Sequence, residues 1–314
     1  KLLLNFMNDN HNHYFLFLDA LRSDHIKYMP WLNSKVKKGI FVENLKISSG
    51  FCERAEIFFS KNPSTTNLLN AIQIDFKKNN TIKPFYWLNG FTIPLLEFLE
   101  KNNFLQKIIR RVLWNISLRL SSIGMYPQRI PLSILNKVSL TEDSIDFEEY
   151  AKKSKKGLLN SIIQKGYRIN WEYFTSLSSQ LSGNDFDRLN FLKKRISLYK
   201  NTFIPIYIGL PDKLGHEFGP HSKEIIQGLK SLDKELKFFF EHCMDDNIHS
   251  KISFIGDHGM EKVIDSIDVE KIIQSLSRKL KIKSNVDFYY FLDSTILRIW
   301  WKNNSKSKFK TFFN

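Results

Sequence analysis

The chain has 314 residues, of which 42% are hydrophobic, 14% are aromatic and two are cysteines. This composition excludes a disordered, collagen-like or disulfide-stapled protein. Lys and Arg outnumber Asp and Glu by 47 to 32, which gives a net charge of +15. Such an excess suits an anionic partner, but the lysines are scattered along the chain, so we expect no specific nucleic-acid binding.

No targeting or membrane segment is visible in the sequence. The apolar stretch at residues 2–4 is too short for a secretory signal, and no apolar run approaches the length of a membrane span. Two cysteines are compatible with a reducing compartment, so the cytoplasm is slightly favoured. Because the chain does not begin with Met, a signal peptide that is missing from it stays an alternative.

Three short apolar runs predict strands, at residues 14–18, 204–210 and 252–255. The runs are continuous rather than alternating, which is typical of strands buried on both faces. An aspartate follows each run within two residues; these are Asp19, Asp212 and Asp257.

Helical patterns separate the predicted strands. They cover residues 95–102 and 105–118, and Ser222 is a plausible N-cap of a further amphipathic helix. Strands that alternate with helices predict an α/β fold with a mostly parallel sheet flanked by helices. Ligands bind beyond the carboxyl ends of the strands in such sheets, so we expect the three aspartates to converge on one crevice.

Strand signals fade between residues 84 and 200. We therefore predict a discontinuous α/β core of residues 1–83 and 201–314, interrupted by a helical insertion or cap at residues 84–200. Residues 107–114 of this cap form a basic amphipathic stretch that could touch a membrane surface. We favour packing of its apolar face on the core over that contact.

Two stretches carry residue types that suit metal binding. Asp212 and His216 stand four residues apart on what we expect to be a tight turn after a strand, and such a pair can ligate one ion. Asp257 and His258 are adjacent, and Gly259 lets the chain turn so that both side chains can reach a metal. Carboxylate oxygen and imidazole nitrogen together suit zinc or manganese better than calcium or magnesium.

In this order the motifs resemble the alkaline phosphatase superfamily, in particular its type I phosphodiesterase/nucleotide pyrophosphatase branch. The resemblance is carried by residues 18–22, 211–220 and 256–260. It implies an alkaline-phosphatase-like fold and a centre of two divalent metal ions, with zinc favoured over manganese.

The resemblance also implies roles for single residues. Asp19, Asp257 and His258 look like the ligands of one ion, and Asp212 and His216 like those of the other. The implied reaction is an in-line displacement at phosphorus by a side-chain nucleophile, after which water hydrolyses the covalent intermediate.

The nucleophile is where the sequence departs from the family pattern. The matching stretch, residues 49–60, has Phe51 at the aligned position, and we take the neighbouring Cys52 as the nucleophile, with Ser49 as the fallback. A thiolate at a helix N-terminus near a metal would be reactive, whereas the alternative is a buried cysteine that packs as a small hydrophobe. The residues two and four positions after Cys52 do not match the sulfatase maturation signal, which disfavours a sulfatase.

A second departure is that no histidine follows His258, although the family supplies a further metal-binding histidine downstream. We expect a C-terminal truncation, and the alternative is an incomplete second metal site. His25 and His221 lie near the predicted site and could fill the gap or contact substrate. Arg22 could bind a phosphate oxygen of the substrate, or else pair with a structural carboxylate.

We therefore predict a metal-dependent phosphodiesterase or nucleotide pyrophosphatase that acts on an anionic phosphorylated substrate. One alternative is a phosphotransferase of the same fold that acts on a glycan or lipid head group. The other is a degenerate binding module without catalytic activity.

Overall fold

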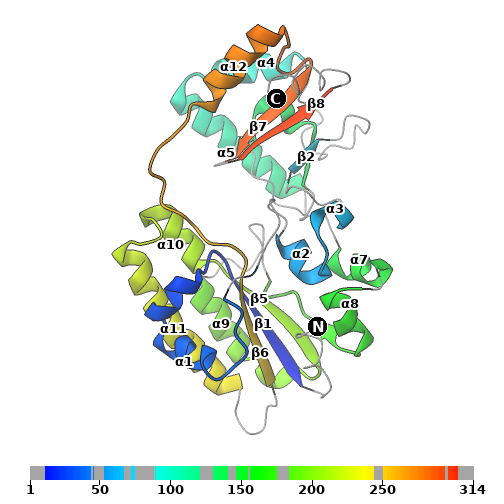
Figure 1. The fold of residues 1–314 in the computed structure, drawn as a ribbon. Coiled ribbons are helices and arrows are strands. Elements are labelled where there is room, and N and C mark those ends of the chain that lie inside the picture. Colours follow the sequence, from blue (N-terminus) through cyan, green and yellow to red (C-terminus); the bar gives the residue numbers. More distant parts are fainter. Residues whose placement is uncertain are drawn as a thin grey trace. The chain divides into compact units, whose positions relative to one another are not determined.

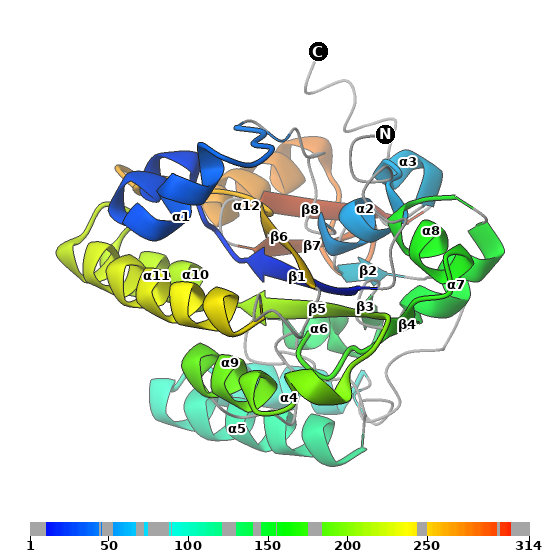
Figure 2. The same ribbon diagram turned by 90° about the horizontal axis from the view of Figure 1, so that it is seen from below.

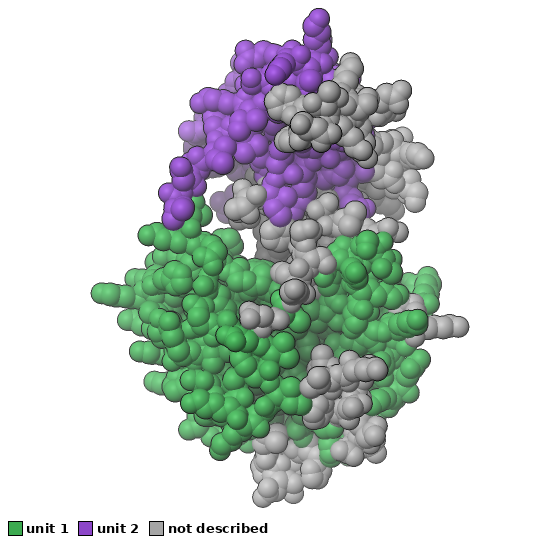
Figure 3. Space-filling model, in the orientation of Figure 1, with its two compact units in different colours: residues 1–70, 145–263 green, residues 71–144, 264–314 purple. Residues whose placement is uncertain are grey.

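The computed structural model describes residues 11–43, 45, 53–66, 72–74, 88, 90–120, 130–140, 146–154, 156–174, 184–243, 250–293 and 296–302. The chain divides into two compact units (Figure 3). Unit 1 comprises residues 1–70 and 145–263, and unit 2 comprises residues 71–144 and 264–314. These boundaries differ from those of the predicted domains, because residues 145–200 belong with the parallel sheet and residues 264–314 do not.

Unit 1 is built around a parallel sheet (Figure 1). Its strands are β1 (Asn12–Leu18), β4 (Arg168–Ile169), β5 (Thr202–Ile208) and β6 (Ser250–Gly256). Its α-helices are α1 (Pro30–Val36), α2 (Glu53–Phe59), α3 (Pro63–Thr66), α7 (Phe147–Ser154), α8 (Leu158–Gln164), α9 (Asp185–Lys193), α10 (Leu210–Phe218) and α11 (Lys223–Cys243). Two short 3₁₀ helices, η2 (Ser23–Tyr28) and η4 (Ile196–Leu198), complete the described elements of the unit.

The four described strands of this sheet lie in the order β4-β5-β1-β6, and every neighbouring pair is parallel. Helices cover both faces, with α1, α9 and α11 on one side and α2, α7 and α8 on the other (Figure 2). This confirms the predicted α/β fold, in which a parallel sheet is flanked by helices.

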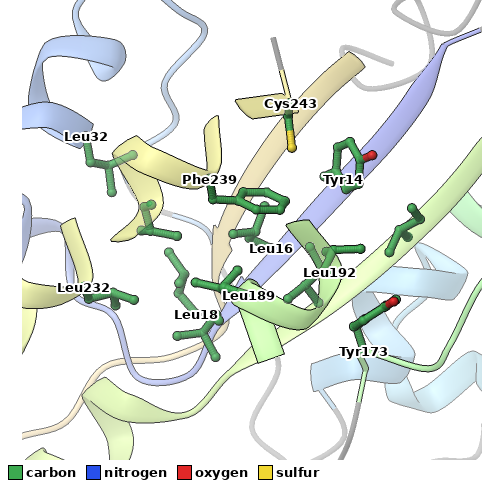
Figure 4. Packing of buried hydrophobic residues seen from close by; sticks show 14 of the residues in the cluster. Tyr14, Leu16, Leu18, Leu32, Tyr173, Leu189, Leu192, Leu232, Phe239 and Cys243 are labelled. Atoms are coloured by element: carbon green, nitrogen blue, oxygen red, sulfur yellow. The ribbon is translucent and has the colours of Figure 1, made fainter. Parts of the chain in front are cut away.

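The core of unit 1 follows from the alternation of side chains along β1. Tyr14, Leu16 and Leu18 face one layer of helices, where they pack with residues of α9 and α11 such as Leu192 and Phe239 (Figure 4). The intervening phenylalanines of the strand face the other layer, around α2 and α8. Both faces of the strand are therefore buried, as the continuous apolar run predicts.

The helix after Ser222 begins as expected. The backbone N–H of Ile225 donates to Ser222 Oγ at 3.2 Å, which is the predicted N-cap of α11. Strand β5, in contrast, ends at Ile208, and Leu210 already begins α10. Pro211 favours this helix start because its ring fixes φ near the helical value. The expectation of a tight turn that carries Asp212 and His216 was therefore wrong, since a helix carries them.

Unit 2 has its own described elements and its own core. They are β2 (Ile72–Ile74), α4 (Thr92–Leu99), α5 (Asn103–Leu120), α6 (Leu132–Leu135), β3 (Val138–Leu140), α12 (Val269–Leu280), β7 (Phe288–Asp293) and β8 (Ile296–Trp301). The pairs β2–β3 and β7–β8 are antiparallel. Leu113 of the basic helix α5 is buried in the core of this unit, beside Leu135 and Phe291. No helix among the described residues is both long and apolar enough to cross a membrane.

Candidate metal centre

The register of the parallel strands brings two of the three predicted aspartates together. Leu18 of β1 pairs with Ile208 of β5 and with Gly256 of β6, so the three strands end at the same level. Asp19 and Asp257 are the next residues on two neighbouring strands. They lie at the carboxyl edge of the sheet, where the sequence predicts them.

Asp19, Asp257 and His258 form the candidate metal site, which we call the β-edge site. One ligand atom from each residue lies within 4.8 Å of the others. His258 Nε2 is 3.3 Å from Asp19 Oδ1 and 3.6 Å from Asp257 Oδ2. Within the part of the chain that the structure describes, this is the group of three or more metal-ligating side chains that could hold an ion.

Hydrogen bonds of Asp257 fix the geometry of this site. Its Oδ1 accepts from the backbone N–H of Ala20 at 3.0 Å and from that of His258 at 2.8 Å. Ala20 has a φ of 57°, which is the left-handed region, so the chain turns sharply after Asp19. The Asp257 carboxylate therefore joins the loop after β1 to the loop after β6.

The donor set of the β-edge site fits a divalent cation. Two carboxylates and an imidazole suit zinc or manganese. The buried Oδ1 of Asp19 accepts no hydrogen bond from the described residues, which leaves it available to an ion. Burial disfavours the charged imidazole, but the carboxylates of Asp19 and Asp257 outweigh it and raise the pKa of His258 to about 10. The site therefore attracts positive charge.

Tyr207, which the sequence analysis missed, also belongs to this site. Its hydroxyl donates a hydrogen bond to Asp19 Oδ2, and its ring stacks on Phe17. Burial raises the pKa of the Tyr207 hydroxyl, and so do the negative charges of three carboxylates, namely Asp19, Asp212 and Asp257. The sequence signal was a tyrosine near the end of the apolar run at residues 204–210.

Asp212 and His216 form a second pair of candidate ligands, one turn apart on α10. His216 Nε2 is 3.2 Å from Asp212 Oδ1, and 65% of the His216 side chain is exposed. Helix α10 packs against the loop after β6, because a Cβ at Gly215 would lie 2.8 Å from Met260 Sδ. The pair thus lies on a helix that touches the loop of the β-edge site.

The structure gives Arg22 protein partners. Its Nε is 2.8 Å from Asp24 Oδ1, and its Nη1 is 2.7 Å from Glu261 Oε1 and also donates to the Met260 carbonyl. These contacts join the loop after β1 to the loop after β6. They fit the structural alternative for Arg22, so phosphate binding by this side chain stays a prediction.

The remaining predicted residues lie elsewhere or outside the described part. Cys52 and Ser49 are outside the described residues, and α2 begins at Glu53, directly after Cys52. His25 is buried, and its Nε2 lies 2.9 Å from the Pro220 carbonyl oxygen. That contact gives His25 a structural role between η2 and the segment after α10, while His221 is exposed.

Comparison with known proteins places this geometry in a family context. A model of the type I phosphodiesterase/nucleotide pyrophosphatase family matches residues 136–309. A venom phosphodiesterase of Macrovipera lebetinus is 41% identical over 63 residues, which is 19% of this chain and 7% of that protein. Venom phosphodiesterase 2 of Crotalus adamanteus is 36% identical over 91 residues, which is 28% of this chain and 10% of that protein.

A mammalian relative is also similar to this chain over a short stretch. Ectonucleotide pyrophosphatase/phosphodiesterase family member 3 of Mus musculus is 35% identical over 63 residues, which is 19% of this chain and 7% of that protein. The matched part of the chain thus spans a tenth or less of the length of these three relatives.

Proposed function

Because the chain belongs to the type I phosphodiesterase/nucleotide pyrophosphatase family, we propose that it is a metal-dependent hydrolase of phosphodiesters or phosphoanhydrides. The observation that carries the proposal is the β-edge site, where Asp19, Asp257 and His258 converge at the carboxyl end of a parallel sheet. Relatives named phosphodiesterase and nucleotide pyrophosphatase support an anionic phosphorylated substrate. The net charge of +15 would help to attract it.

In this proposal the chain's own residues hold two divalent ions, with zinc favoured and manganese as the alternative. Asp19, Asp257 and His258 would hold one, and Asp212 and His216 the other. Bound there, such ions would stabilise the negative charge of the attacking side chain and the charge that develops on the leaving oxygen. Tyr207 would orient the Asp19 carboxylate through its hydroxyl, since burial and the surrounding carboxylates keep that hydroxyl protonated.

The proposed nucleophile is Cys52, which directly precedes α2, with Ser49 as the fallback. The thiolate would attack phosphorus and displace the alcohol or phosphate leaving group, and water would then cleave the phosphoenzyme to return the thiolate. Replacement of Cys52 by Ala tests this role. Loss of turnover with metal binding retained supports Cys52, whereas unchanged turnover moves the role to Ser49.

The first experiment is a zinc and manganese titration of the purified chain and of Asp257→Ala, together with an assay on bis(4-nitrophenyl) phosphate. We expect two metal equivalents in the unchanged chain and the loss of at least one in Asp257→Ala. Asp265→Ala is the control, because Asp265 is exposed and lies, like Asp257, in the segment between β6 and α12. A folded chain that binds neither metal would overturn the proposal.

The same assay separates the alternatives. Metal binding without turnover would favour a degenerate binding module, and transfer of the phosphoryl group to an added alcohol in preference to water would favour a phosphotransferase. The cytoplasmic preference gains no support from relatives that are named venom and ectonucleotide enzymes.

A further inference from the structure

The turn between β5 and α10 is held by two side chains of α9. Asp185 Oδ2 accepts a hydrogen bond from the backbone N–H of Leu210 at 2.7 Å, and Arg188 Nη1 donates to the carbonyl oxygen of Tyr207. Arg188 Nη1 also lies 3.3 Å from Asp185 Oδ1. The Asp185–Arg188 pair therefore contacts both ends of this turn.

Burial makes this pair costly, and the buried Nε of Arg188 has no hydrogen-bond partner among the described residues. The side chains of Asp185 and Arg188 are only 14% and 8% exposed. Burial raises the pKa of Asp185 and lowers the pKa of Arg188, because it disfavours both charged forms. A buried ion pair often stabilises a fold no more than a well-packed apolar pair of similar volume does. We therefore attribute the presence of Asp185 and Arg188 to their hydrogen bonds with the backbone of the turn, and not to a gain in the stability of the fold.

The turn itself is closely packed. A Cβ at Gly209 would lie 3.1 Å from Cε1 of the Tyr207 ring, so ring and backbone are already close. The Arg188 guanidinium also lies over this ring, 6.0 Å from its centroid. The ring, the turn and the Asp185–Arg188 pair thus form one packed group.

The two elements that this turn connects carry three residues of the candidate centre. Tyr207 donates its hydroxyl to Asp19, and α10, which starts at Leu210, bears Asp212 and His216. Asp257 and His258, in contrast, follow β6, and the Asp257 carboxylate accepts hydrogen bonds from the Ala20 and His258 amides. A shift of the turn would therefore move Asp212 and His216 directly. It would reach the β-edge site only through the Tyr207–Asp19 hydrogen bond and the contact between Gly215 and Met260.

From this geometry we propose that Asp185 and Arg188 are positioning residues that set the orientation of α10 and so of the Asp212–His216 metal pair. The inference rests on the proposed function, because it assigns to these residues the second ion of that centre. Neither residue lies in the three sequence motifs. They act through the backbone of the turn and do not touch the metal.

The test compares Asp185→Ala and Asp185→Asn with Asp187→Asn, a matched control. Asp187 is exposed and lies in the first turn of the same helix. We expect Asp185→Ala to weaken the binding of one of two zinc equivalents by about 10–100-fold and to weaken the other clearly less. Asp185→Asn keeps an oxygen acceptor for the Leu210 amide and should lose less zinc affinity than Asp185→Ala. For the same reason, Arg188→Lys, which keeps a donor, should lose less zinc affinity than Arg188→Met.

A second readout needs no metal. Hydrogen exchange of the Leu210 amide in the metal-free protein should rise at least about tenfold in Asp185→Ala, relative to Asp187→Asn. If Asp185→Ala fails to fold, Asp185→Asn and Arg188→Lys supply the same comparison.

The outcomes separate this inference from the proposed function. Two zinc equivalents in the unchanged chain with equal affinities in Asp185→Ala and Asp187→Asn would overturn the inference alone. Equal weakening of both equivalents, in step with a lower melting temperature, would also overturn it, because Asp185 would then act only through folding. An unchanged chain that binds no zinc would overturn the proposed function, and the exchange result would still decide whether Asp185 holds the turn.

Discussion

His13 is a buried histidine in the middle of the parallel sheet, and it links stability to pH. Its Nε2 lies 2.8 Å from Ser253 Oγ, and its ring meets the Phe203 ring edge-on. Burial, with a smaller effect of the Lys251 charge, lowers the pKa of His13 from 6.5 to about 4. The unfolded chain therefore takes up a proton on His13 at a higher pH than the folded chain does.

The consequence is a loss of stability in acid. The contribution of His13 is fully present above pH 6.5 and is lost as the pH falls from 6.5 to about 4, by about 3 kcal/mol at most. We expect the free energy of unfolding in urea to fall less steeply over this range in His13→Gln than in the unchanged chain. His242→Gln, at an exposed position of α11, is the control. Equal slopes for His13→Gln and the unchanged chain would contradict the assignment.

Single residues also show how far sequence reasoning reaches. The approach of Asp19 to Asp257 could be predicted, because parallel strands with recognisable ends fix which residues share an edge. Tyr207 and Asp185 could not, because their part in the site depends on side-chain direction and on how α9 packs against a turn. Periodicity carries no information about either.

Gly157, the residue before α8, lies close to the last residue of helix α2. A Cβ at Gly157 would lie 2.2 Å from the carbonyl oxygen of Phe59, the last residue of α2. Gly157 also has a φ of 105°, which L side chains rarely adopt. Because α2 directly follows Cys52, this contact bears on the proposed nucleophile.

Gly157→Ala should therefore be more destabilising than an ordinary glycine replacement. Gly166→Ala is the matched control, because Gly166 has a φ of 79° but no atom within 4 Å of an added Cβ. We expect the control to lose about 1–2 kcal/mol of unfolding free energy from backbone strain alone. Gly157→Ala should lose at least about 1 kcal/mol more, because Phe59 must move and because a φ of 105° with a ψ of 178° is a conformation essentially restricted to glycine. Equal losses of unfolding free energy for the two variants in urea titrations would contradict this prediction and would show that α2 can move to accept the added methyl group.

Element boundaries were harder to predict than element types. The apolar run at residues 204–210 contains both the end of β5 and the first residue of α10, and hydrophobicity does not distinguish the two. Pro211 was the better signal, since a proline that follows a strand closely suits the first turn of a helix. The unit to which the helices between residues 84 and 200 belong could not be predicted either, because helical periodicity says nothing about long-range contacts.

At the scale of the molecule, the two units have separate cores, and the proposed metal ligands all lie in unit 1. Leu135→Ala opens a cavity in unit 2, where Leu135 is fully buried. We expect it to lower the stability of unit 2 by about 2–5 kcal/mol and to leave zinc affinity unchanged. Leu16→Ala, at a fully buried position of unit 1, should instead reduce the apparent zinc affinity.

Thermal unfolding with and without zinc checks this division. Zinc should raise only the melting temperature of the transition that Leu16→Ala lowers, because a ligand stabilises the unit that binds it. A zinc affinity that falls as much in Leu135→Ala as in Leu16→Ala would contradict the assignment of zinc binding to unit 1.

The contact between Gly215 and Met260 also has a consequence for how such a sequence changes over time. A methyl group at position 215 would collide with the Met260 sulfur, and Met260 follows the Asp257–His258 ligands by two residues. A lineage could therefore accept alanine at 215 either with a shift of the flexible Met260 side chain or after a smaller residue had replaced Met260. The two positions, 45 apart in the chain, should covary, and each would limit the paths of substitution open to the other.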